Sequence, residues 1–125
     1  MRKQLIQRIG TVGALAVLAL AGWAHGPAGK AIEVSGTVVD VACYVGHEST
    51  GPKHAKCAEA CAKAGNPLAI LETKTGKLYL PVSMDHKNPN TPLMGHIEKR
   101  VTVTGKLVEK GGLRGLAIEK VTAAE

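Results

Sequence analysis

Soft metal ligands gather in one short stretch of this sequence. All three cysteines of the chain lie there, as Cys43, Cys57 and Cys61, and His47 and His54 lie between the first two. Thiolate and imidazole are the ligands that zinc and copper favour in proteins. The stretch therefore predicts a site for copper or zinc, with the three cysteines and His54 as ligands and His47 as a further candidate.

An alanine-rich run is predicted to position most of these ligands on one helix, residues 53–64. Lys and Glu between the alanines favour helix, Pro52 suits a first helical turn, and Gly65 suits the position just past the last. His54, Cys57 and Cys61 are then spaced i, i+3 and i+7, which places them on one face. Cys43 is predicted to lie at the end of the preceding strand.

A second candidate metal group lies further along the chain, before the predicted fourth strand. It combines thioether and imidazole side chains, from Met84, His86, Met94 and His96. Methionine together with histidine favours copper over zinc in an exported protein. The alternative is that the two methionines only fill gaps in the packing.

Residues 1–24 have the pattern of a secretory signal peptide. Basic residues precede an apolar run, and Gly22-Trp23-Ala24 offers a cleavage site between small residues. The run is shorter than the roughly 20 residues that span a bilayer. We therefore expect a periplasmic or secreted protein that meets the membrane only through this segment, with residues 25–30 as a flexible N-terminal segment.

The composition of the remaining chain excludes some classes of function. The net charge falls from +6 to +3 when the three basic residues of the signal leave, and the only aromatic residues then left are Tyr44 and Tyr79. Neither the charge nor the aromatic content suits nucleic-acid binding. The sequence shows no paired carboxylates and no nucleophile motif, so we expect a binding protein and not an enzyme.

The strand pattern predicts a mainly β domain over residues 31–122. β-branched or alternating runs, separated by glycine and proline turns, mark five strands, at residues 32–44, 67–72, 77–82, 100–109 and 113–121. A short helix or turn is expected at residues 91–98. This order predicts a five-stranded OB-fold-like barrel, with the cysteine-bearing helix inserted between strands one and two.

Two parts of the sequence carry a resemblance to known proteins. Val-Ser-Gly-Thr-Val-Val-Asp and Arg-Val-Thr-Val-Thr-Gly-Lys-Leu-Val look like the first and fourth strands of small exported bacterial OB-fold proteins. The segment Asp40-x2-Cys43-Tyr44, followed by His54-x2-Cys57-Ala58-x2-Cys61-x3-Gly65-x-Pro67, resembles exported bacterial proteins with no established activity. The resemblance implies an OB-fold with the cysteine helix beside its ligand face.

Two functions remain open from the sequence. The leading hypothesis is an exported protein that binds copper or zinc, for metal handling or electron transfer, with another exported protein as partner. The alternative follows from the oxidising compartment, which favours disulfides. Cys43 would then pair with Cys57 or Cys61 and leave one thiol free, because two cysteines on one helix fit a disulfide poorly. That protein would be a disulfide-stapled module for a peptide, protein or small-molecule partner.

Overall fold

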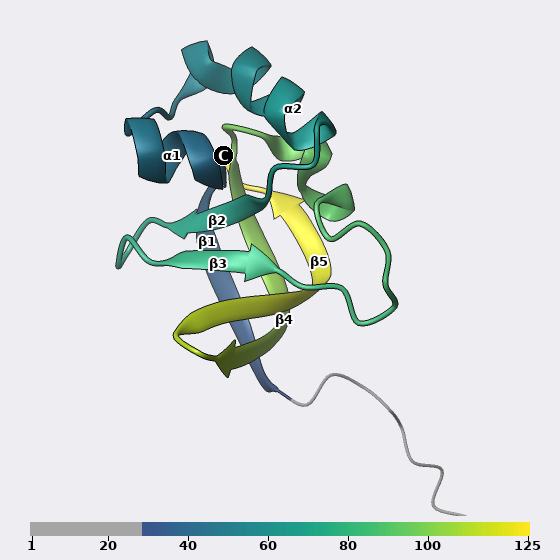
Figure 1. Ribbon diagram of the computed structural model, residues 1–125. Helices are drawn as coiled ribbons and strands as arrows, with labels where there is room; N and C mark the ends of the chain where they lie inside the picture. Colours follow the sequence, from purple (N-terminus) through teal and green to yellow (C-terminus); the bar gives the residue numbers. More distant parts are fainter. Residues whose placement is uncertain (1–28) are drawn as a thin grey trace, which may run out of the picture.

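A computed structural model describes residues 29–125 of the chain (Figure 1). The predicted signal peptide and most of the predicted flexible segment 25–30 lie outside these residues. Five strands form a closed barrel: β1 (Lys30–Asp40), β2 (Leu68–Glu72), β3 (Leu78–Pro81), β4 (Arg100–Lys110) and β5 (Leu113–Ala123). The order around the barrel is β1-β2-β3-β5-β4, and only the β3–β5 pair is parallel. The predicted five-stranded OB-type barrel is confirmed.

Short helices complete the fold. Between β1 and β2 the chain forms α1 (Val41–His47), the 3-10 helix η1 (Pro52–His54) and α2 (Ala55–Lys63). The inserted cysteine-bearing helix is thus confirmed, and α1 and α2 lie together at one end of the barrel (Figure 1). A further 3-10 helix, η2 (Thr91–His96), precedes β4 where a short helix or turn was expected. Among residues 29–125, no helix combines the length and the hydropathy needed to cross a membrane.

The core of the barrel is aliphatic, as a domain without phenylalanine requires. Its largest fully buried side chains include Leu68, Ile70, Leu93 and Leu116. Two alanines of α2, Ala58 and Ala62, belong to the same buried cluster. Because these alanines dock α2 against the barrel, they also fix the direction of the residue that precedes each of them, and those residues are Cys57 and Cys61.

The end of β1 differs from the prediction. The sequence predicted a strand through residue 44, whereas β1 ends at Asp40 and Cys43 lies in the first turn of α1. The β-branched Val41 favours strand, but Asp40 caps a helix by accepting a hydrogen bond from the Cys43 backbone N–H at 2.7 Å. α1 ends at His47, and its C-cap Glu48 has a left-handed φ of 51°. Residues 48–51 then connect α1 to η1.

Candidate metal centre

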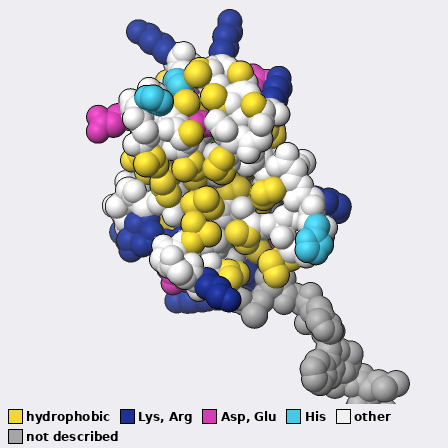
Figure 2. Space-filling model, viewed as in Figure 1, with side chains coloured by type: hydrophobic (Ala, Val, Ile, Leu, Met, Phe, Trp, Pro, Cys, Tyr) yellow, Lys and Arg dark blue, Asp and Glu magenta, His cyan; other side chains and the backbone are white. Residues whose placement is uncertain are grey.

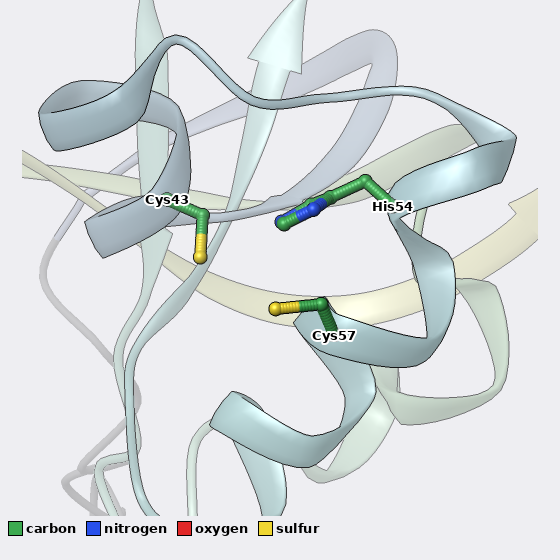
Figure 3. Close-up of side chains that lie close together, drawn as sticks. All are labelled: Cys43, His54 and Cys57. Atoms are coloured by element: carbon green, nitrogen blue, oxygen red, sulfur yellow. The ribbon is translucent and has the colours of Figure 1, made fainter.

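Two overlapping groups of ligand side chains lie where α1 meets α2. The ligand atoms of Cys43, His54 and Cys57 all lie within 4.8 Å of one another, and the same limit holds for Asp40, Cys43 and Cys61. Cys43 therefore belongs to both groups. Figure 3 shows the three side chains of the first group pointing toward one another across the gap between the helices. The cluster has the donor atoms and the spacing to bind a metal ion.

The three cysteines of the cluster differ in how far they are buried. Cys43, in the first turn of α1, is only 9% exposed. Cys57 is exposed and Cys61 is half-buried, both on α2. Ala58 and Ala62 face the core, so the neighbouring cysteines face α1 and not the barrel interior. The result is a cluster with a buried base and one side open to solvent.

His54 ends η1 and occupies the position just before α2. Its Nε2 is buried and has no hydrogen-bond partner. Its backbone N–H donates to the Gly51 carbonyl at 2.8 Å, and Gly51 adopts a φ of 102° that suits glycine. The turn that precedes the helix therefore sets the position of the imidazole.

Glu98 anchors that turn to the barrel. Its Oε2 accepts hydrogen bonds from Gly51 N at 2.7 Å and from the Thr50 hydroxyl at 2.9 Å. Its own backbone N–H donates to the Val38 carbonyl of β1 at 2.8 Å, and the residue is only 7% exposed. Glu98 thus connects the His54 turn to a buried strand of the barrel.

Asp40 is a site residue that sequence reasoning missed. It is fully buried, and its Oδ1 accepts from the Cys43 N–H while its Oδ2 has no partner. Its position three residues before Cys43, at the end of a strand, is the one available signal, because that spacing is typical of a helix N-cap. Glu98 was also missed, and no local signal marks it, since its partners lie more than forty residues earlier.

The surroundings of Cys43 hold its thiol in the protonated form. Burial, together with a hydrogen bond and the negative charge from the Asp40 carboxylate, raises the pKa of Cys43 to about 12. Cys61 contributes in the same direction. A metal ion that binds here must therefore displace a proton from Cys43.

The disulfide that the alternative hypothesis requires is absent from the structure. Cys43, Cys57 and Cys61 are all free thiols. The two cysteines of α2 also belong to different groups, because no group of mutually close ligands within residues 29–125 contains both of them. The four predicted ligands Cys43, His54, Cys57 and Cys61 are therefore divided between two groups and do not form one set.

The other predicted ligands lie apart from this cluster. His47 is exposed at the end of α1. Met84 is 63% exposed, whereas Met94 packs against the core as a gap-filling methionine would. The described part of the chain has no group of close Cys, His, Asp or Glu ligands that includes His86 or His96.

A separate hollow lies beside β3 and η2, away from the cysteines. It has a volume of about 480 Å³, and Met84, Pro89 and Ile118 are among its lining residues. Figure 2 shows hydrophobic side chains gathered over the middle of the viewed face, where β2 and β3 lie, with Lys and Arg around them. Neither feature contains metal ligands in a close group, so the cluster between α1 and α2 is the candidate functional site.

Fold and site together define a class: a small β-barrel protein with a Cys/His/Asp cluster formed by the end of the first strand and the helices inserted after it. Comparisons of the chain with protein families, curated proteins and solved structures gave no match. The function must therefore be argued from the chemistry of the cluster.

Proposed function

We propose that this is an exported protein that binds copper or zinc through Cys43, His54 and Cys57, with Cys61 beside them on α2. The observation that carries the proposal is the mutual distance of at most 4.8 Å among two sulfurs and an imidazole nitrogen. In a tetrahedral zinc site such ligand atoms lie about 3.5–3.8 Å apart. A contraction of about 1 Å, within reach of side-chain rotation, would complete the coordination.

A buried nitrogen atom of the His54 imidazole supports this role. A buried polar atom without a hydrogen bond is destabilising by about 1–3 kcal/mol, and native proteins contain few of them. His54 Nε2 is such an atom, and a metal ion in the cluster would satisfy it. The turn that precedes His54 is also tied to the barrel through Glu98, which helps to position the imidazole.

The exposure of the site favours exchange of the bound metal ion over its permanent storage. Cys57 faces solvent, and three protein ligands leave a fourth coordination position for a ligand from elsewhere. An ion held in this way can be passed to another exported protein. A copper ion can also pass an electron to one, which zinc cannot, because zinc has no redox chemistry. We therefore assign the protein to metal handling or electron transfer. Export itself rests on the signal-peptide pattern of residues 1–24.

Metal content and free-thiol count, measured on protein purified from the periplasm, test the proposal. We expect at least one equivalent of bound copper or zinc, and its loss in Cys57→Ser, a change at an exposed position that spares the core. His47→Gln, an exposed histidine outside the cluster, is the matched control and should keep the metal. Protein without metal, and with a single titratable thiol after denaturation, would overturn the proposal in favour of a disulfide-stapled module.

A further inference from the structure

We propose that Asp40, Cys43 and Cys61 form a second metal position, and that the Cys43 thiolate bridges two divalent ions. This inference rests on the proposed function, because Cys43 is also a ligand of the first position. It adds a ligand, Asp40, that the sequence did not suggest. It also indicates that the bound metal ions are divalent.

The geometry divides the ligands into two sets around one sulfur. Cys57 and His54 form one group with Cys43, and Cys61 and Asp40 form a second group with it. The ligand atoms of each group lie within 4.8 Å of one another. Within residues 29–125 no close group contains both cysteines of α2, so the side chains offer two sets of three ligands that have only Cys43 in common. Two ions that share the Cys43 sulfur would use every ligand of both sets.

The buried carboxylate provides an independent reason to place a cation here. Asp40 is fully buried, and one of its oxygens, Oδ2, has no hydrogen-bond partner. The ion pairs among residues 29–125 join other acidic residues to Lys or Arg, and none of them includes Asp40. Buried charges in proteins are normally paired or bound to a metal. A cation between Asp40 and Cys61 would compensate this charge.

Charge balance indicates the valence of the ions. Three thiolates and one carboxylate carry four negative charges, and two divalent cations neutralise them. Two monovalent copper ions would leave the half-buried cluster with a net negative charge, which desolvation disfavours. Zinc is divalent and accepts sulfur, nitrogen and carboxylate oxygen. Each zinc ion would have three protein ligands and one open position.

The test is a titration of the reduced full chain with Zn(II) under anaerobic conditions, followed by ¹¹³Cd NMR of the Cd(II)-loaded protein. We expect binding to saturate at two equivalents of Zn(II). The spectrum should show two cadmium resonances that split each other by scalar coupling through the shared sulfur. Such coupling requires a bridging ligand, so stoichiometry and spectrum test separate parts of the inference.

Matched variants assign each ion to its position. Cys61→Ala and Asp40→Asn should each lose the ion of the second position and keep the ion bound by Cys43, His54 and Cys57. Cys57→Ala should lose the ion of the first position and keep that of the second. Alanine is a strong helix former, so α2 should persist in the cysteine variants. Asparagine caps helices as well as aspartate does, so Asp40→Asn should keep α1. Far-UV circular dichroism of each metal-free variant checks both expectations.

The outcomes separate this inference from the proposed function. One equivalent in the parent protein, lost in Cys57→Ala and kept in Cys61→Ala, would overturn the second position and leave the proposed function standing. If the parent protein binds one equivalent and both Cys57→Ala and Cys61→Ala retain it, the bridge is overturned, because one ion then binds to either set of ligands. No bound ion at all would overturn the proposed function as well.

Discussion

Cys43 and Cys57 present the same functional group in opposite environments. Cys43 is buried beside a carboxylate that holds its proton, whereas Cys57 faces solvent on α2. The thiolate is the form that binds metals and attacks electrophiles. The two residues should therefore differ in reactivity before any metal is bound.

We expect iodoacetamide to alkylate Cys57 first and Cys43 last in the reduced, metal-free protein. The reason is that burial and Asp40 raise the pKa of Cys43 to about 12, so its thiolate fraction is very small at neutral pH and grows only as the pH approaches that value. Peptide mass spectrometry over a pH series gives the rate at each cysteine. Equal rates for both cysteines at neutral pH would show that Cys43 is neither shielded nor protonated as described.

Glu98 shows how a residue far along the chain can control the site. Substitution by alanine should destabilise the protein by about 1–3 kcal/mol, because the Gly51 N–H loses its acceptor. Metal affinity should also fall, because the turn that positions His54 loses its bond to the barrel. Denaturant unfolding of the metal-free protein and a competition titration with a chromophoric chelator measure the two effects.

Glu98→Gln is the matched control for this prediction. Glutamine keeps an acceptor oxygen and the same left-handed backbone position, where the φ of residue 98 is 56°. It should recover most of the stability and affinity. If the alanine variant binds metal as tightly as the parent protein, the turn before His54 does not depend on this anchor.

At the scale of elements, α1, η1 and α2 form the insertion that carries the site. α2 contributes only two fully buried alanines to the core. This small buried surface suggests that the inserted helices open more readily than the barrel. Ligands from all three helices meet in the cluster, so an ion would hold them together.

We therefore predict that metal binding slows amide hydrogen exchange in residues 41–63 much more than in β4 and β5. A site that joins separate segments couples their ordering to binding. Exchange measured by mass spectrometry with and without Zn(II) tests this. The double variant Cys57→Ala/Cys61→Ala, which removes the α2 ligand of both groups, serves as the control that should show no change. Identical protection in both states would mean that packing alone orders the insertion.

The elements differ in how far the sequence could predict them. α2 was predictable because its alanines, Pro52 and Gly65 are local signals. α1 was not, because Val41 favours strand and only the hydrogen bond from Cys43 N–H to Asp40 makes the chain turn. The role of Glu98 depends on contacts between distant residues. The sequence also predicted His54, Cys57 and Cys61 on one face of a helix, but it could not show that Cys43 would belong to two groups of ligands.

At the scale of the whole molecule, the barrel was the most predictable part. Alternation in β4 and the turn at Gly111 and Gly112 are local patterns, and the five strands close in the order expected of an OB-type barrel. The barrel spans residues 30–123, close to the predicted domain of residues 31–122. The barrel supplies Asp40 at the end of β1 and reaches Glu98 just before β4, so the fold itself positions the site.

Removal of the predicted signal peptide would give the exported protein a defined first residue. We expect the signal peptidase to cleave after Ala24, between small residues, so that the exported chain begins at His25. N-terminal sequencing of protein recovered from the periplasmic fraction measures this directly. A chain that keeps Met1, or that is recovered only from the cytoplasm, would contradict the proposed location.

The most direct test of metal binding by this cluster is X-ray absorption spectroscopy at the edge of the bound metal. For zinc we predict sulfur neighbours at about 2.3 Å together with imidazole nitrogen at about 2.0–2.1 Å. In His54→Gln the imidazole scattering should disappear while the sulfur neighbours remain. A spectrum with only oxygen and nitrogen neighbours, or one that His54→Gln leaves unchanged, would contradict the assignment of the ion to Cys43, His54 and Cys57.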